Sequence, residues 1–223
     1  MSPRPHTARE EGGPGPGRLG NVRALPRAAD DALLVERLRN GDARAQATFY
    51  DRFSELVERI LVRVLGMDRE LDDLHHDVFV QAIESVRKLR DPAALRAWVI
   101  SVTVNTAHAT IRRRQRWRWI ALWREAEPPA AVARARSPEA AEAVRATYAV
   151  LETLPADERV AFALRHVEGM ELTEAAAACG VSLATIKRRL ARAEERFRVA
   201  AGAHPVLEEW MEGGGRWTSP RRR

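Results

Sequence analysis

Hydrophobic residues recur at three- and four-residue steps along much of the chain, which is the spacing of one face of an α-helix. The pattern is clearest between residues 42 and 66, where the apolar positions are Ala45, Phe49, Phe53, Leu56, Ile60 and Val64. Asp42 precedes this stripe as a helix N-cap, and Gly66 follows it as a residue that tolerates the positive φ of a helix end. We therefore predict a long amphipathic helix between these two residues.

The same spacing predicts helices on both sides of this one. A short helix carries Leu33, Leu34 and Leu38 and ends at Gly41. Asp68 is predicted to open a third helix, whose inward positions are Leu71, Leu74, Val78, Ala82, Val86 and Leu89. Asp91–Pro92 forms a cap with a first-turn proline. The helix after it carries Leu95, Trp98, Val99 and Val102 and continues into "RRRQRWRWIALWRE", residues 112–125.

A second helical segment begins at Ser137–Pro138 and is interrupted at Leu154–Pro155. Its last part is "ELTEAAAACGVSLATIKRRLARAEERF", in which Thr173 is predicted to cap a helix of small residues. Gly180 then supplies a tight turn and Ser182 caps a longer helix. The apolar stripe of that helix is Ile186, Leu190, Ala193 and Phe197. Two short helices joined by such a turn predict a helix-turn-helix, whose second helix can enter the major groove of DNA.

These patterns predict an all-α protein with two helical domains, residues 29–124 and 139–200, joined by a flexible linker, residues 125–138. The C-terminal domain contains the helix-turn-helix. Residues 1–28 are rich in Pro, Gly and Arg and are predicted to be a disordered N-terminal arm, because they offer little apolar surface to bury. Residues 201–223 are expected to form a mobile C-terminal tail.

The chain is basic, with 37 Lys and Arg against 31 Asp and Glu and a pI of about 10.5. A positive field favours a polyanionic partner, either nucleic acid or an acidic membrane surface. Lys88 and Lys187 are the only lysines, and coding bias in a GC-rich genome explains such an excess of Arg. Cys179 is the only cysteine, so no intrachain disulfide can form. With no apolar run long enough to span a bilayer and no signal-peptide pattern at the N-terminus, a cytoplasmic protein without stable membrane insertion is expected.

The helix that follows Ser182 has a polar face opposite its apolar stripe. Side chains that can reach base edges or phosphates lie there; they are Ser182, Thr185, Lys187, Arg188, Arg189 and Arg192. A helical hairpin with a solvated basic face would show some of these features. The N-cap, the turn glycine, the apolar stripe and the basic outer face occur together, however, which indicates DNA binding.

Residues 154–198, "LPADERVAFALRHVEGMELTEAAAACGVSLATIKRRLARAEERFR", resemble the fourth domain of bacterial RNA polymerase sigma factors. Residues 29–124 resemble the second sigma domain. There, "DRELDDLHHDVFVQAIES" is similar to the helix that docks on the polymerase, and "LRAWVISVTVNTAHATIRRR" to the promoter-opening helix. Because only these two domains are present, the chain resembles the extracytoplasmic-function (ECF) group.

The resemblance implies a transcription initiation factor that binds core RNA polymerase, recognises −35 and −10 promoter DNA and promotes strand opening. It assigns polymerase binding to Asp73, Leu74, His76, Asp77 and Phe79, and −10 contacts to Asn105, Arg112, Arg113 and Arg114. The −35 contacts fall on Ser182, Thr185, Lys187, Arg188, Arg189 and Arg192. Five positions depart from the family. His76 replaces a usual glutamine, and Val104 and Ala109 replace the Arg and Asp of many relatives. Arg188 replaces a common serine, and Ala175 replaces a usual isoleucine. An anti-sigma factor is the further partner that the family implies.

Two alternatives remain open from the residues. One is a helix-turn-helix transcriptional regulator that acts without replacing the sigma subunit, and the other is a peripheral membrane protein that uses the Arg- and Trp-rich stretch. Trp117, Trp119 and Trp123 could pack the linker, stack on unpaired bases or lie at a membrane surface. Neighbouring His75 and His76 point apart on a helix, so no metal site or other cofactor is expected. With no nucleophile–base arrangement in the sequence, an enzyme is not expected either.

Overall fold

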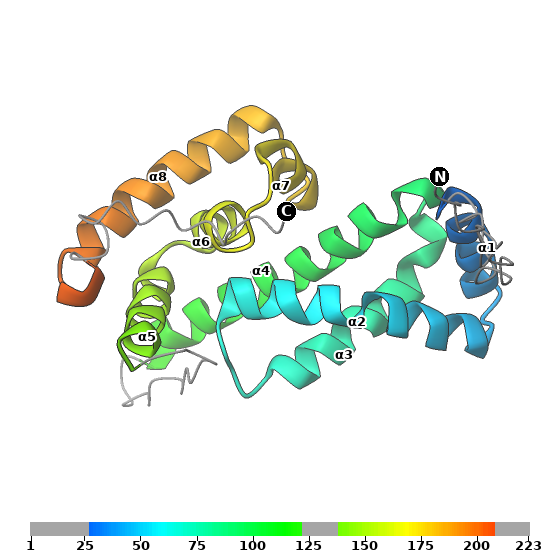
Figure 1. Cartoon of the computed structure of the whole chain (residues 1–223), viewed down its shortest axis with the longest axis horizontal. Coiled ribbons are helices and arrows are strands. Elements are labelled where there is room, and N and C mark those ends of the chain that lie inside the picture. Colours follow the sequence, from blue (N-terminus) through cyan, green and yellow to red (C-terminus); the bar gives the residue numbers. More distant parts are fainter. Residues whose placement is uncertain (1–26, 122–137, 208–223) are drawn as a thin grey trace, which may run out of the picture.

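The computed structural model describes residues 27–121 and 138–207, and every regular element in these two ranges is helical. The helices of the first range are α1 (Arg27–Arg39), α2 (Ala43–Leu65), α3 (Leu71–Ser85), the 3₁₀ turns η1 (Val86–Lys88) and η2 (Pro92–Ala94), and α4 (Leu95–Ala121). Those of the second are α5 (Pro138–Thr153), α6 (Ala156–Phe162), the π-helical η3 (Ala163–Val167), α7 (Leu172–Ala178) and α8 (Leu183–Ala201) (Figure 1). Most of the expected N-terminal arm, most of the linker and most of the C-terminal tail lie outside the described residues. Helix α1 already begins at Arg27, within the expected arm, and Ala201 and Leu207 of the expected tail are buried.

Local signals set the ends of α2 as predicted. The carboxylate of Asp42 accepts hydrogen bonds from the backbone N–H groups of Arg44 and Ala45, at 2.8 and 3.3 Å. At the other end Gly66 has a φ of +83°, which a residue with a side chain rarely adopts. The third helix begins later than predicted, at Leu71, because the Asp68 carboxylate caps the preceding turn by accepting from the Glu70 N–H. Its α-helical part ends at Ser85, so Val86 lies in the 3₁₀ turn that follows.

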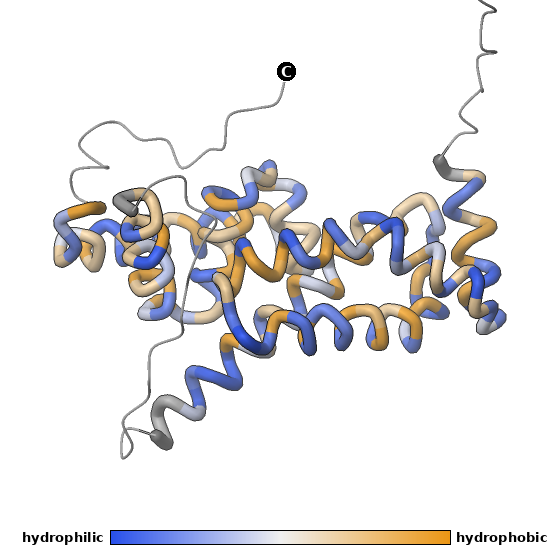
Figure 2. Tube along the Cα trace, turned by 60° about the horizontal axis from the view of Figure 1, so that its bottom comes forward, coloured by the Kyte–Doolittle hydropathy of each residue, from blue (hydrophilic) through white to orange (hydrophobic). Residues whose placement is uncertain are grey.

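Helices α1 to α4 form one helical unit around α2. The predicted stripe of α2 is buried almost throughout, and Phe49 and Phe53 pack with their ring centroids 5.2 Å apart. Phe79 of α3 meets Phe49 edge-on at 5.5 Å. Apolar and polar residues follow one another turn by turn along the helices (Figure 2), so each helix places an apolar face toward the core.

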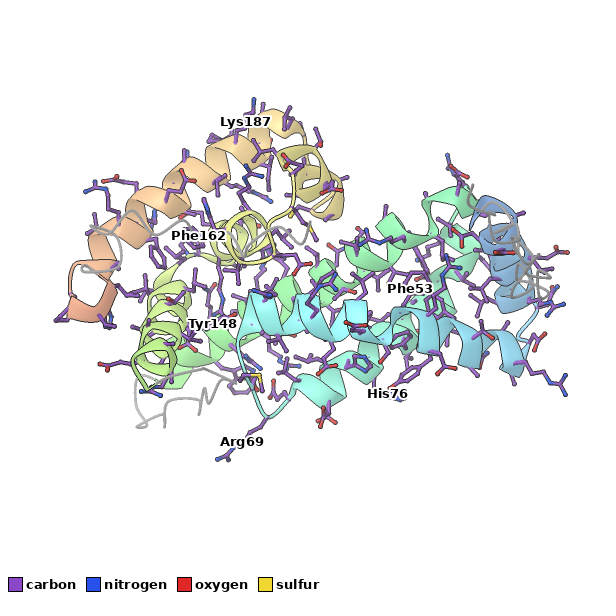
Figure 3. All side chains as sticks on the ribbon, viewed as in Figure 1. Phe53, Arg69, His76, Tyr148, Phe162 and Lys187 are labelled. Atoms are coloured by element: carbon purple, nitrogen blue, oxygen red, sulfur yellow. The ribbon has the colours of Figure 1, made fainter. Side chains whose placement is uncertain are left out.

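Helices α5 to α8 form a second unit with a small core of its own. Phe162 of α6 stacks on Phe197 of α8 with ring centroids 4.6 Å apart. Leu151, Leu154 and Leu207 are buried around this pair. Figure 3 shows Phe162 inside this unit and Lys187 on the outer side of α8.

The two units pack against each other, an arrangement that the sequence pattern does not predict. Buried residues of η3 and α7, among them Leu164 and Ala175, belong to the same hydrophobic cluster as the core of α2 and α4. Helix α4 contacts both α6 and α7, and α2 contacts η3. The second unit therefore covers one side of the first (Figure 1).

Candidate nucleic-acid interface

Helices α7 and α8 form the predicted helix-turn-helix. Gly180 occupies the turn with a φ of +62°. The hydroxyl of Ser182 accepts from the Thr185 N–H at 3.2 Å, which confirms the predicted N-cap of α8. The predicted cap at Thr173 is wrong: α7 begins at Leu172, and the carboxylate of Glu174 accepts from the Glu171 N–H instead, at 3.1 Å.

Two faces of α8 differ in polarity, as the sequence predicts. Ile186, Leu190, Ala193 and Phe197 are buried. The small buried residues of α7, Ala175, Ala176 and Ala178, let the two helices approach closely. On the opposite face Lys187, Arg188 and Arg192 are exposed to solvent. These three cations are free of the core and can face a polyanion.

Arg189 differs from its basic neighbours because its side chain is only 25% exposed. Its Nη2 donates to the Asp157 carboxylate at 3.0 Å. The other oxygen of that carboxylate lies 2.7 Å from Nε2 of His108, on α4. The predicted −35 residue Arg189 is therefore tied, through Asp157, to the helix predicted to open the −10 element.

Helix α4 presents a second polar stripe. Asn105, Ala109, Arg112 and Arg116 follow one another at helical spacing, and all four are exposed. The other side of the helix is buried through residues such as Val104 and Ala107. The predicted −10 residues Asn105 and Arg112 thus share one solvent-facing stripe, and Trp117 near its end is 63% exposed.

Arg113 and Arg114 lie beside this stripe and contact the turn between α2 and α3. The Nη2 atoms of both arginines lie near Oε2 of Glu70, at 3.1 and 2.9 Å. Arg114 Nη1 also pairs with the Asp68 carboxylate at 2.7 Å. The basic run predicted to follow the DNA backbone is therefore partly neutralised within the chain.

The predicted polymerase-binding helix, α3, has an acidic outer face. Asp72, Asp73, His76 and Asp77 are exposed. Leu74 and Phe79, which the family resemblance also places at this surface, are each only 4% exposed and pack in the core. These two residues support α3 from within, and the exposed carboxylates are the groups that a basic partner can reach.

Contacts between the two units form a further cluster, which the sequence pattern does not predict. The buried guanidinium of Arg159, on α6, donates to the carbonyls of Val64 and Leu65 at 3.2 and 3.0 Å. These carbonyls belong to the last turn of α2, which lacks partners within its own helix. The hydroxyl of Tyr148, on α5, donates to Val62 O at 3.0 Å and to Arg63 O at 3.2 Å. The second unit thus caps the C-terminus of α2.

Burial shifts the pKa of two groups in this region. The low polarity around Tyr148 raises the pKa of its hydroxyl above the ordinary 10.0, although Arg63 and Arg159 act in the opposite direction. Burial likewise raises the pKa of the Cys179 thiol to about 11, against a smaller lowering by Arg189. Both groups are therefore protonated at neutral pH.

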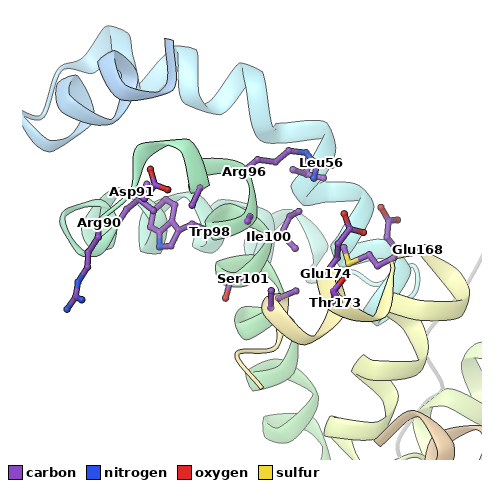
Figure 4. A pocket seen from close by; sticks show the side chains of 17 residues that line it. Leu56, Arg90, Asp91, Arg96, Trp98, Ile100, Ser101, Glu168, Thr173 and Glu174 are labelled. Carbon is purple, nitrogen blue, oxygen red and sulfur yellow. The ribbon is translucent and has the colours of Figure 1, made fainter. Parts of the chain in front are cut away.

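A cleft of about 770 Å³ lies between the two units, open between α7 and the start of α4 (Figure 4). The cleft is lined by the apolar side chains of Trp98 and Ile100 and by the charged side chains of Arg96, Glu168 and Glu174. Glu168 is itself engaged, because its carboxylate pairs with Nε of Arg59 at 3.0 Å. The cleft follows from the incomplete contact of the two units.

None of the helices in the described part of the chain is long and apolar enough to cross a membrane. Among the same residues, no group of three or more His, Cys, Asp or Glu side chains is arranged to hold a metal ion.

Two family models match the chain, and together they cover more than half of it. The model for sigma-70 region 2 matches residues 49–117, and the model for sigma-70 region 4 matches residues 145–197. The first match contains α3 and the exposed stripe of α4, and the second contains the helix-turn-helix.

Curated relatives and solved structures agree with these matches. The chain is 28% identical over 188 residues to the RNA polymerase sigma-H factor of Pseudomonas aeruginosa, covering 80% of this chain and 96% of the relative. It is 27% identical to the ECF RNA polymerase sigma-E factor of Haemophilus influenzae, covering 74% of this chain and 92% of the relative.

The fold is similar to that of CnrH in complex with the cytosolic domain of CnrY, with a TM-score of 0.52 and 22% identity over 78% of this chain and 98% of that one. It is equally similar to RpoE of Bartonella quintana in complex with the anti-sigma factor NepR, with a TM-score of 0.52 and 22% identity over 71% and 97% of the two chains. The two sigma-70 regions, in this order and on these helices, show that the chain belongs to the sigma-70 family of RNA polymerase sigma factors, in its extracytoplasmic-function group.

Proposed function

We propose that this sigma factor reads −35 DNA with α8, captures opened −10 DNA with the exposed stripe of α4, and docks on core RNA polymerase through the acidic face of α3. The observation that carries the proposal is the helix-turn-helix, where Ser182 caps α8 and Lys187, Arg188 and Arg192 stand exposed opposite a buried stripe. The chain contributes binding, and its polymerase partner carries out the chemistry. The cytoplasm, where that polymerase and its template are, is the proposed location.

The −35 contact uses two kinds of side chain. An α-helix fits the major groove of B-DNA, and an arginine there can donate two parallel hydrogen bonds to O6 and N7 of guanine. Arg188 and Arg192 are the exposed arginines on the outer face of α8, and Lys187 beside them can pair with a phosphate. Arg189 joins them only after it leaves Asp157.

The −10 contact requires separated strands. The exposed amide of Asn105 can donate to and accept from the edge of an unstacked base, and Arg112, two turns further on, can pair with the backbone. Binding of an unpaired base offsets part of the few kcal/mol that unpairing costs. Strand opening then follows from tighter binding of the open state, with no covalent step.

Docking on polymerase is proposed for the exposed groups of α3, Asp72, Asp73, His76 and Asp77. Charged groups that face a complementary surface raise the association rate and set the orientation of binding. An anti-sigma factor is proposed as a further partner, because the two solved structures described above are complexes, one with the cytosolic domain of CnrY and one with the anti-sigma factor NepR.

Simultaneous binding of both promoter elements requires the two units to separate. Asp157 bridges Arg189 and His108 through contacts of 3.0 and 2.7 Å, so the −35 and −10 surfaces lie close together. The −35 and −10 elements are about 25 base pairs apart, or about 85 Å at about 3.4 Å per base pair. We propose that this structure is a closed state. A fully extended chain of 16 residues, the number between the described ranges, spans at most about 55 Å. The remaining ~30 Å is within the dimensions of the two units, since the 27 residues of α4 alone extend about 40 Å.

Reconstitution with core polymerase tests the proposal. Start-site-specific transcripts from a genomic promoter library should depend on this chain, and the library should yield a common −35 sequence. Replacing Lys187 and Arg188 by Ala should abolish the preference at −35 positions, while the charge-matched pair Arg145→Ala and Arg198→Ala should retain it. Sequence-specific binding by the chain alone, with no effect on polymerase, would instead identify the self-sufficient helix-turn-helix regulator.

A further inference from the structure

The turn between α2 and α3 holds two carboxylates against the basic end of α4. Gly66 ends α2, and the Asp68 side chain then accepts from the Glu70 N–H at 2.9 Å, which fixes the conformation of the turn. Figure 3 shows Arg69, between these two acidic residues, pointing away from the protein. The carboxylates of Asp68 and Glu70 point the other way, toward α4.

The two carboxylates hold two of the three consecutive arginines. Oε2 of Glu70 accepts from both Arg113 and Arg114, at 3.1 and 2.9 Å. Oδ2 of Asp68 lies 2.7 Å from Arg114 Nη1, and the Asp68 side chain is only 13% exposed. Arg112 lies on the neighbouring exposed stripe, so it faces solvent in a different direction.

A carboxylate and a DNA phosphate offer a guanidinium the same kind of acceptor, a pair of anionic oxygens. A phosphate that approaches Arg113 or Arg114 must displace the carboxylate or accept its repulsion. We propose that Asp68 and Glu70 compete with promoter phosphates for Arg113 and Arg114, and thereby set the strength and the salt dependence of the −10 contact. This inference rests on the proposed function, in which the arginine run follows the DNA backbone.

The size of this effect on DNA binding follows from how exposed the ion pairs of Asp68 and Glu70 are. Glu70 and Arg113 are each half exposed, and ion pairs in such surroundings contribute little, so each carboxylate should weaken DNA binding by about two- to five-fold. The pair between Asp68 and Arg114 is less exposed, so Asp68 should weaken DNA binding by a factor at the upper end of this range. Salt screens these pairs, since the Debye length is about 10 Å at about 0.1 M. The weakening of DNA binding by Asp68 and Glu70 should therefore be largest at low salt.

The test is a titration of promoter DNA with holoenzyme at several salt concentrations. Glu70→Gln keeps the size of the side chain, and Asp68→Asn keeps an oxygen that can cap the turn. Each variant should bind two- to five-fold more tightly at low salt, the double variant about ten-fold, and the gain should shrink as salt rises. Glu36→Gln and Glu142→Gln, which remove exposed charges on α1 and α5, are the matched controls.

A double-mutant cycle separates this inference from the function on which it rests. In an Arg113→Ala, Arg114→Ala background the gain from Glu70→Gln should vanish. If it persists, or if Glu36→Gln produces the same gain, the effect is one of net charge and the competition is refuted. If the arginine variants bind DNA more weakly but Glu70→Gln changes nothing, the arginines contact DNA without competition. If the arginine variants bind like the wild type, the role proposed for the arginines in DNA binding fails as well.

Discussion

Removal of one hydroxyl group should shift the protein away from its closed state. Tyr148 donates a single hydrogen, shared between Val62 O and Arg63 O at 3.0 and 3.2 Å. Its ring lies over Gly66, where an added Cβ would come within 3.0 Å of the ring. Tyr148→Phe keeps this ring packing and removes only the hydrogen bond that the Tyr148 hydroxyl donates to α2.

A hydrogen bond of this kind contributes about 0.5–1.5 kcal/mol net. At about 1.4 kcal/mol per factor of ten, the ratio of open to closed molecules should rise about two- to twelve-fold. Because only the open state can span both promoter elements, the apparent affinity for polymerase and promoter should rise by up to the same factor.

Energy transfer between two dyes measures the closed fraction directly. Dyes can be attached at Asn40→Cys and Ala203→Cys, which are exposed positions in different units, in a Cys179→Ala background. Tyr50→Phe is the control, since Tyr50 is the only other tyrosine and its ring packs on His75 and Phe79, within the first unit. If Tyr148→Phe leaves both the transfer distribution and the promoter affinity at the values of the control, the reasoning about this contact is wrong.

Three further measurements follow from local features of the structure. Burial raises the pKa of Tyr148, so its hydrogen bond stabilises the closed state fully below about pH 10 and is lost as the pH rises through the raised pKa of the folded protein. In Tyr50→Phe, the absorbance change of tyrosinate near 295 nm should therefore appear at a higher pH than in a tyrosine peptide. The Cys179 thiol, with a pKa of about 11, should react with Ellman's reagent at pH 8 on the order of a hundred-fold more slowly than a peptide thiol, and an ordinary rate would show that the residue is not buried as described. Asp42→Ala should lower the free energy of unfolding by about 1 kcal/mol in a urea titration because α2 loses its cap, whereas Asp42→Asn should cost much less; equal losses in both would contradict the capping role.

Residues that act on their immediate neighbours were predictable. The caps at Asp42 and Ser182 bind N–H groups two or three residues away, so the pattern around them is enough. The turn glycines Gly66 and Gly180 have the positive φ values that the pattern required. Thr173 shows the limit of such reasoning, because a threonine and a glutamate two residues apart both suit a helix start, and the structure uses Glu171.

The sequence also predicted which side chains lie on the outer faces of the helices. It did not predict which of these side chains are free to bind a partner. Lys187, Arg188 and Arg192 stand exposed as expected, because helical periodicity alone separates them from the buried stripe. Arg189 and Arg114 satisfy the same pattern, and yet each is paired with a carboxylate from another element. Nothing in the local spacing distinguishes them from their neighbours.

The sequence by itself determined the helices, the ends of α2, the start of α8, the helix-turn-helix and the two sigma regions, since these depend on contacts within a few residues and on periodic burial. Only the tertiary structure decided how the two units meet. Arg159 and Tyr148 bind carbonyls of α2 that lie about 85 to 95 residues earlier in the chain. A backbone carbonyl is the same at every residue and carries no signal in the sequence, so such a partner is identified only when folding brings the end of a helix to a buried donor.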